Sequence, residues 1–293
     1  MRLILYLKFL SIIVLINSCS INKESLQLEL IKNITPPNGI LISENIYCDQ
    51  TEVSNFEWFC FMNWTEEKFG LESQEYLNTC PDKDVWKRAD SCNLSMDQYY
   101  LTNPAYRDYP VIGISQNQAN NFSKWRSDRV FEYMLIDAGI IKEDTSIIFT
   151  VQKFFTNQIE RLNSDIEIIY YPEFRLPNII ERKNILKYTD SIDNNYSLKY
   201  KPKNIKLIRS DILNPCREFP TRICYNYKSA KKVLNLYNIR GNVSEWAYEE
   251  NITYGGSWNN SYYEIIQSDI IEIEKQNIYT GFRNICEYKK WNE

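Results

Sequence analysis

Four residues late in the chain have the spacing of an oxygen ligand set. In this stretch, three backbone carbonyls and one carboxylate can turn toward one point, an arrangement that suits a hard cation such as calcium. The four residues are Asn238, Gly241, Val243 and Glu245. A tight turn is the alternative, because Gly241 and Asn242 tolerate positive φ angles and Trp246 can fill the core. The spacing leaves both interpretations open.

Two further glycine-containing blocks follow. They are Gly255-Gly256-Ser257-Trp258 and Gly281-Phe282-Arg283. Paired glycines let one backbone segment pass close to another while a neighbouring indole is buried. We therefore interpret these blocks as structural, and all three blocks together as a compact core that is rich in loops.

The titratable side chains offer few catalytic arrangements. The chain has no histidine, so zinc or iron sites of the usual mixed histidine type are unavailable. Carboxylates accompany the motifs at Glu52, Glu173, Glu181 and Glu245. No spacing pairs two of them as acid and base, so we expect salt bridges, helix caps or ligands of the ion site.

The first residues have the pattern of an export signal. Arg2 and Lys8 make the start positive, residues 9–16 are almost wholly apolar, and an approximate bacterial lipobox, Ile-Asn-Ser-Cys, ends at Cys19. The apolar run is shorter than the ~20 residues that a membrane span needs. We therefore predict a lipoprotein signal peptide at residues 1–18 and lipidation of Cys19.

The remaining chain is acidic and long enough for one large domain. Removing residues 1–18 takes away two of the 34 basic residues and no acidic one, which leaves 32 basic against 38 acidic side chains, a net charge of −6. This balance argues against nucleic-acid binding. We interpret residues 19–45 as a lipidated N-terminus and tether, and residues 46–293 as one domain without internal repeats.

Seven cysteines follow Cys19, which is compatible with an exported chain. They are Cys48, Cys60, Cys80, Cys92, Cys216, Cys224 and Cys286. The short loops that join Cys80 to Cys92 and Cys216 to Cys224 make these two pairs candidate disulfides. Because seven is an odd number, at least one thiol stays unpaired.

A capping box predicts the first helix. Ser54 and Glu57 have the required spacing, and apolar residues recur at helical intervals over residues 55–64. The expected inner face of this helix consists of Phe56, Phe59, Cys60, Asn63 and Trp64. We interpret these aromatic residues as core and not as a ligand platform.

A short buried strand and a second helix are predicted next. Residues 111–114 form an apolar run, after which Ser115 and Gln118 make another capping box. The helix that they open is expected to end near Gly139. Polar or lysine- and asparagine-rich segments are interpreted as insertions over the common core, at residues 65–104, 141–172 and 183–222.

The motifs together resemble one known family. Besides the three late blocks, the chain has Thr-Glu-Val-Ser-Asn at residues 51–55, Tyr-Pro-Val-Ile-Gly-Ile-Ser at 109–115 and Phe-Arg-Leu-Pro at 174–177. In this order, from about residue 46 to 286, they resemble the formylglycine-generating enzyme (sulfatase-modifying factor) family. The resemblance implies an α+β, C-type-lectin-like fold with short strands and two main helices, and a calcium ion at the first block.

One stretch is similar to a particular branch of that family. Residues 103–115 include Asn-Pro-Ala-Tyr before Tyr-Pro-Val-Ile-Gly-Ile, and residues 124–133 read Lys-Trp-Arg-Ser-Asp-Arg-Val-Phe-Glu-Tyr. Both resemble the gliding-motility lipoproteins of the GldJ and GldK type, which belong to the type IX secretion system. The lipobox at Cys19 agrees with the same branch.

The resemblance stops at the catalytic metal site. Formylglycine-generating members hold copper with a cysteine pair, and those positions are Asn260 and Ile265 here, neither of which supplies the thiolate that Cu(I) requires. Related sulfoxide synthases use histidines, which this chain lacks. Cys286 has no histidine to activate it, so we expect a structural or disulfide role. Ile179 and Arg182 also replace the Glu and Trp usual in the family.

We therefore predict a non-catalytic lipoprotein of the cell outer membrane, on its periplasmic side, that acts as a structural component of a gliding-motility or type IX secretion assembly. The expected partners are other secretion or motility lipoproteins and outer-membrane proteins, and no copper or iron is expected. Two alternatives stay open: a metal-dependent oxidase with another metal arrangement, and a lectin-like module whose exposed aromatic side chains bind glycans.

Overall fold

The computed structural model describes residues 34–89, 96–162, 168–200, 220, 222, 236–260, 264 and 269–292. Its fold is α+β and contains two four-stranded sheets. The first sheet has the order β1 (Gly39–Ser43), β2 (Ile46–Asp49), β8 (Ile285–Lys290) and β3 (Tyr170–Arg175). The second has the order β6 (Ile270–Glu272), β5 (Ile252–Tyr254), β4 (Ser244–Trp246) and β7 (Thr280–Gly281). The short strands and loop-rich connections confirm the predicted fold class.

The helices differ greatly in length. Three are long: α2 (Asn55–Phe69), α6 (Gln116–Asp137) and α8 (Ile179–Tyr200). The others are short: α3 (Gln74–Leu77), α4 (Val85–Ala89), α5 (Met96–Tyr99), the 3-10 helix η2 (Pro104–Tyr106) and α7 (Val151–Phe155). Within the described residues, no helix combines the length and the apolar character needed to cross a bilayer.

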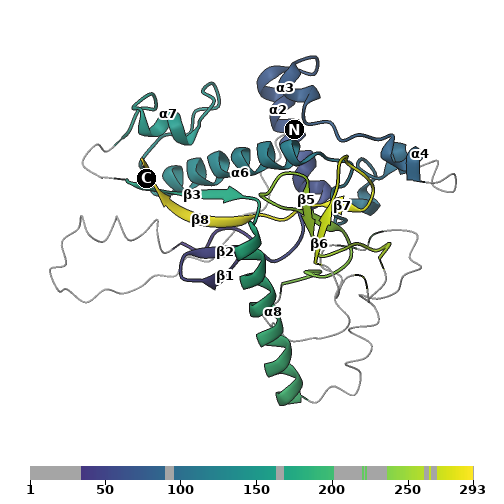
Figure 1. Cartoon of the computed structure of the whole chain (residues 1–293). Coiled ribbons are helices and arrows are strands. Elements are labelled where there is room, and N and C mark those ends of the chain that lie inside the picture. The colour runs from purple at the N-terminus through teal and green to yellow at the C-terminus, as the bar shows by residue number, and fades with distance from the viewer. Residues whose placement is uncertain are drawn as a thin grey trace.

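The first sheet joins the two ends of the folded chain. Strand β8 pairs antiparallel with β2 on one side and with β3 on the other. Helix α6 packs along β3, and Figure 1 shows it lying parallel to the long strands of this sheet. The second sheet lies beside it, with β4 and β7 paired in parallel. The chain therefore passes from one sheet to the other between β7 and β8.

The folded domain begins earlier than predicted. Strand β1 pairs with β2 through Gly39↔Asp49 and Ile40↔Cys48, and Ile40 is buried against Ile185 and Ile285. A start at residue 46 is therefore wrong, because part of the segment interpreted as tether forms an edge strand of the first sheet.

Helix α2 starts where the capping box predicts, but it presents the opposite face to the core. Ser54 and Glu57 make both capping hydrogen bonds. The buried side chains are Asn55, Trp58, Phe61, Met62 and Thr65. Of the predicted inner face, Phe56 is 45% exposed, Phe59 42% exposed, and Cys60 and Asn63 are exposed too. The predicted face of this helix is therefore wrong.

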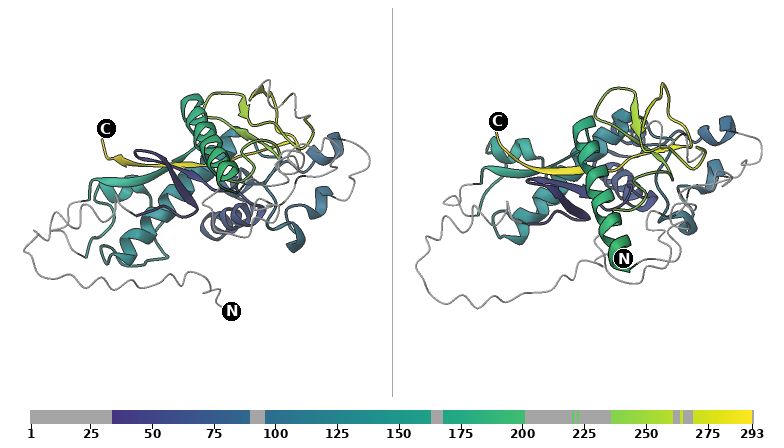
Figure 2. Two further views of the ribbon diagram at one scale, coloured as in Figure 1. Left: turned by 90° about the horizontal axis from the view of Figure 1, so that it is seen from below. Right: turned by 60° about the horizontal axis from the view of Figure 1, so that its bottom comes forward.

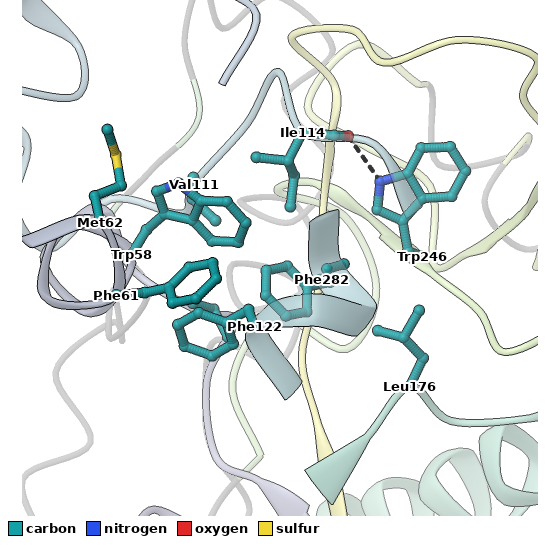
Figure 3. Packing of buried hydrophobic residues seen from close by; sticks show 11 residues of the cluster. Trp58, Phe61, Met62, Val111, Ile114, Phe122, Leu176, Trp246 and Phe282 are labelled. Atoms are coloured by element: carbon teal, nitrogen blue, oxygen red, sulfur yellow. Dashed lines mark hydrogen bonds between the residues drawn. The ribbon is translucent and has the colours of Figure 1, made fainter. Parts of the chain in front are cut away.

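The sequence of α2 contains two apolar stripes, and packing selects between them. Trp58 stacks on Phe122 of α6, with ring centroids 5.5 Å apart, and its indole Nε1 donates to the Thr79 carbonyl at 3.0 Å. An indole buried with its N–H satisfied stabilises more than a phenyl ring in the same place. Figure 3 shows Trp58, Phe61 and Phe122 packed together with Phe282 from the last motif block.

The predicted start and end of helix α6 are confirmed. It is opened by the Ser115 and Gln118 capping box and ends at Asp137, and Gly139 follows with φ +67°. Two of its side chains contact neighbouring segments: Asp128 accepts from the Val151 N–H at 2.8 Å, and the Arg126 guanidinium lies over the Phe174 ring at 4.2 Å.

Residues 111–114 are buried, but they do not form a strand. Gly113 has φ +70°, where an added Cβ would lie 2.7 Å from the Asp82 carbonyl oxygen. The backbone N–H groups of Val111 and Gly113 donate to Val53 and Asn277, which belong to separate segments. The predicted strand is wrong because the chain bends here, so that its backbone N–H groups bond to two separate segments and not to one neighbouring strand.

Two of the expected insertions belong to the core or to regular structure. Ile141, Phe149, Val151, Phe154 and Ile168 are buried around Phe131, so residues 141–172 do not simply cover the core. Of the expected insertion at residues 183–222, the described stretch 183–200 lies in α8. Figures 1 and 2 show the second half of this helix extending away from both sheets.

Helix α8 has a start signal that the motif-based analysis missed. The Asn178 Oδ1 accepts from the Glu181 N–H at 3.0 Å, and a Glu181 carboxylate oxygen accepts from the Asn178 N–H at 2.8 Å. This is a reciprocal capping box. The described part of the chain therefore has three long helices and not the two that were expected.

The corrected face of α2 predicts unequal effects for two matched substitutions. Phe61→Ala should lower the free energy of unfolding by about 3–5 kcal/mol, because it leaves a cavity beside Phe122. Phe59→Ala, on the same helix, should change it by less than about 1 kcal/mol. Urea denaturation of both variants checks this, and a larger loss for Phe59→Ala would contradict the observed face.

Candidate functional site

The motif blocks meet at Arg283, whose side chain is fully buried. Its Nε donates to the Glu245 carboxylate at 2.7 Å. Its two terminal nitrogens donate to backbone carbonyls, Nη1 to Asp49 at 3.1 Å and Gln50 at 3.3 Å, and Nη2 to Tyr237 at 2.7 Å. One guanidinium therefore holds the end of β2, the start of the first late block and β4.

A second buried arginine reaches the same carboxylate. Arg182, in the first turn of α8, donates through Nε and Nη2 to the two Asp269 oxygens, each at 2.8 Å, and through Nη2 to the Ile239 carbonyl. Its Nη1 lies 3.7 Å from a Glu245 oxygen. Glu245 is thus held between Arg283 and Arg182, and both of these side chains are at most 2% exposed.

Glu52 occupies the other side of the late loop and is fully buried. Its carboxylate accepts from the side-chain amide of Asn242 at 2.8 Å and from that of Asn238 at 3.1 Å. Both asparagines have positive φ, as does Gly241 at +85°. The first late block therefore contains a tight turn, which was one of its two interpretations. The Glu52 carboxylate accepts hydrogen bonds from two side-chain amides of this turn.

A third ion pair completes the cluster. Arg126 of α6 contacts the Asp49 carboxylate through two nitrogens, Nη1 at 2.5 Å and Nη2 at 2.9 Å. Asp49 also accepts from the Asn284 N–H at 3.1 Å. We call Asp49, Glu52, Arg126, Arg182, Glu245, Asp269 and Arg283 the buried charge cluster; all are buried except Asp269, which lies at its edge with 25% of its side chain exposed.

The residues predicted to ligate calcium do not fit a calcium site in this arrangement. Glu245 faces two guanidinium groups, which would repel a divalent cation at short range in a buried environment. The side chains of Asn238 and Val243 add no ligand to their backbone carbonyls, because the Asn238 amide donates to Glu52 and the Val243 side chain is buried in a hydrophobic cluster with Ile112 and Ile278. In the described part of the chain, no group of three or more Cys, Asp or Glu residues is arranged to hold a metal ion.

The glycines of the second and third blocks lie where a side chain would meet neighbouring backbone. At Gly255, which has φ +91°, an added Cβ would lie 2.8 Å from the Ile239 carbonyl oxygen. At Gly281, an added Cβ would lie 2.8 Å from the Val111 carbonyl oxygen. The backbone N–H of Trp258 donates to the Asn242 carbonyl at 2.7 Å, which ties the second block to the first.

Asn260, at the first of the two copper-ligand positions, closes a turn. Its Oδ1 accepts from both the backbone N–H and the hydroxyl of Ser257, each at 2.9 Å. Ile265, the second position, lies outside the described residues. The Asn260 side chain thus fixes the Ser257 end of the second block.

The cysteines of the described part carry free thiols, namely Cys48, Cys60, Cys80 and Cys286. Because the Cys80 thiol is free, the predicted disulfide between Cys80 and Cys92 is wrong. Cys19, Cys92, Cys216 and Cys224 lie outside the described residues. Burial raises the pKa of Cys48 to about 12 and raises that of Cys286 as well, so neither thiol ionises readily.

Sequence reasoning missed Arg182, Asp269, Asp49 and Arg126 as members of the site. A buried arginine has no periodicity signal of its own, since most arginines are exposed. The one signal was that Arg182 departs from the family's usual residue. Glu173 and Glu181 are salt-bridged, as expected: Glu181 contacts Arg175 at 2.6 Å, and Glu173 contacts Lys289 at 3.2 Å.

Comparison with known proteins gives one family match. A family model described as "Sulfatase-modifying factor enzyme 1-like domain" matches residues 13–288. Among solved structures, CarF is similar at 14% identity and a TM-score of 0.40, covering 83% of this chain and 87% of its own. Treponema denticola variable protein 1 is similar at 16% identity and a TM-score of 0.38, covering 83% and 84%. No curated protein matches.

Glu52 makes stability depend on pH. Burial raises its pKa from 4.5 to about 7, although Arg283 opposes the shift. Its contribution to stability is therefore present below pH 4.5 and is lost as the pH rises through about 7. Glu52→Gln cannot titrate at this position, so it does not lose this contribution as the pH rises. The difference in free energy of unfolding, variant minus wild type, should therefore rise by about 2–3 kcal/mol between about pH 5 and pH 8. Urea denaturation at both values measures this. The exposed control Glu274→Gln should show no such rise, and a flat difference for Glu52→Gln would contradict the assignment.

The thiols should differ in reactivity. In the native protein, iodoacetamide should modify Cys60, which is exposed, while Cys48 and Cys286 should react only after unfolding, because both are buried. Peptide mass spectrometry with and without urea distinguishes the sites. Modification of Cys286 in the native protein at the rate of Cys60 would be inconsistent with its observed burial.

Proposed function

The chain belongs to the sulfatase-modifying factor enzyme 1-like domain family, and from this premise we propose that it is a non-catalytic, lipid-anchored member that serves as a structural component of a secretion or motility assembly. Its proposed location is the periplasmic side of the cell outer membrane. The proposed partners are other secretion or motility lipoproteins and outer-membrane proteins.

The observation that carries the non-catalytic proposal is the use of Asn260. Copper-dependent oxidation in this family requires a thiolate pair, because Cu(I) prefers soft sulfur ligands. Asn260 stands at the first thiolate position, and its oxygen is engaged by Ser257. An amide that closes a turn supports a structural use of this segment, and Ile265 at the second position has no ligand atom in its side chain.

The anchoring and assembly proposals rest on separate features of the sequence. The lipobox that ends at Cys19 supports attachment to a membrane, and residues 103–115 and 124–133 resemble the GldJ and GldK type. The outward stripe of α2 also supports contact with a protein partner. Phe56, Phe59 and Cys60 lie at helical spacing on its exposed side.

Anchoring through Cys19 predicts a change of cell fraction. Cys19→Ala removes the thiol that would carry lipid, so the protein should move from the membrane fraction to the soluble fraction. Cys60→Ala, which removes an exposed thiol of the folded domain, should leave the protein in the membrane fraction. Retention of Cys19→Ala in membranes after a high-salt wash would count against the lipid anchor.

The scaffold role is tested by purifying the tagged full chain from detergent-solubilised native membranes. We expect a large assembly that contains other lipoproteins, with copper and iron well below one atom per chain. Recovery of a solitary protein that holds stoichiometric copper or iron and consumes oxygen would overturn the proposal in favour of an oxidase.

A further inference from the structure

Arg182 occupies an unusual place for an arginine. It lies in the first turn of α8 with 2% of its side chain exposed, beneath the loop that carries the first late block. Nε and Nη2 are bound to Asp269 and to the Ile239 carbonyl. Within the described residues, Nη1 is buried and has no hydrogen-bond partner. Its nearest opposite charge is the Glu245 carboxylate, 3.7 Å away.

The motif glycines leave space for this side chain. A Cβ on Gly255 would lie 3.0 Å from Arg182 Nη2 and 2.8 Å from the Ile239 carbonyl oxygen that Nη2 contacts. The guanidinium also lies 5.8 Å from the centre of the Tyr254 ring, within cation–π range. The backbone of the second block therefore leaves room for a positive group against the first block.

Around Glu245 the charges balance without a metal ion, because Glu245 and Asp269 contribute two negative charges and Arg182 and Arg283 contribute two positive ones. Elsewhere in the cluster Asp49 is paired with Arg126, and Glu52 is a further carboxyl group whose pKa burial raises to about 7. A buried divalent cation beside Glu245 would leave two uncompensated positive charges close to two guanidinium groups. Uncompensated buried charge is strongly unfavourable.

We propose that Arg182 supplies, from within the chain, the positive charge that holds the loop of Asn238 to Glu245, in the place of the calcium ion that the family resemblance implies. The guanidinium links three segments: α8, the Asp269 side chain at the start of β6, and the Ile239 carbonyl of the loop. The loop should then keep its shape whatever the divalent cation concentration.

The wild-type protein gives the first test. The purified full chain is dialysed against EDTA and titrated with CaCl₂, with isothermal calorimetry and thermal unfolding as readouts. We expect no heat of stoichiometric binding and a change in Tm below about 1 °C at millimolar calcium. Binding of one calcium ion per chain, with a rise in Tm of several degrees, would overturn the proposal.

Variants of Arg182 separate its charge from its packing. Arg182→Lys keeps the positive charge and should retain a higher Tm than Arg182→Gln, which removes it. Arg240→Gln is the matched control, because Arg240 lies in the same loop and pairs with Asp190 on the same helix, but at the surface, so its Tm should change little. Equal losses for the Lys and Gln variants would show that the charge does not hold the loop. If neither variant folds, the calcium titration of the wild type still decides the matter.

Discussion

The rest of this structure depends on a fully buried guanidinium. Arg283 lies between β7 of the second sheet and β8 of the first, and its nitrogens bind Glu245 and the carbonyls of Asp49, Gln50 and Tyr237. A buried arginine that loses its carboxylate costs about 3–5 kcal/mol, because the remaining charge is uncompensated. The partners must therefore stay together, and they come from both ends of the folded chain. The passage between the two sheets is fixed at this residue.

This constraint explains why the motif blocks are dense in glycine and asparagine. The five N–H donors of a guanidinium require acceptors that converge from several directions, and a converging backbone needs positive φ and close approach. Gly241, Asn238 and Asn242 supply the positive φ angles, and Gly255 supplies the close approach to Ile239. The composition of these blocks therefore follows from the way in which they surround the buried guanidinium.

Local signals in the sequence predicted the local structure well. The Ser54–Glu57 and Ser115–Gln118 boxes fixed the starts of α2 and α6, because both depend on residues three positions apart. The face of α2 could not be predicted in the same way, since Phe56–Phe59–Cys60 and Trp58–Phe61–Met62 have the same spacing and only the packing of Trp58 on Phe122 selects one. The charge cluster was hidden for a similar reason: Arg182 and Asp269 look like surface residues until the fold brings them together.

The buried charge cluster should make the motif loops as stable as the sheets, because it ties both to the same charged side chains. Native-state hydrogen exchange tests this stability most directly. The amides to follow lie in or beside the cluster and are hydrogen-bonded to it or across the motif blocks; they are those of Val53, Gly241, Ser244 and Asn284. We predict that they exchange only through global unfolding, with the same opening free energy as the Tyr47 and Cys286 amides of the first sheet. Exchange of the loop amides through local opening, at a free energy several kcal/mol below that of the sheet, would contradict the account.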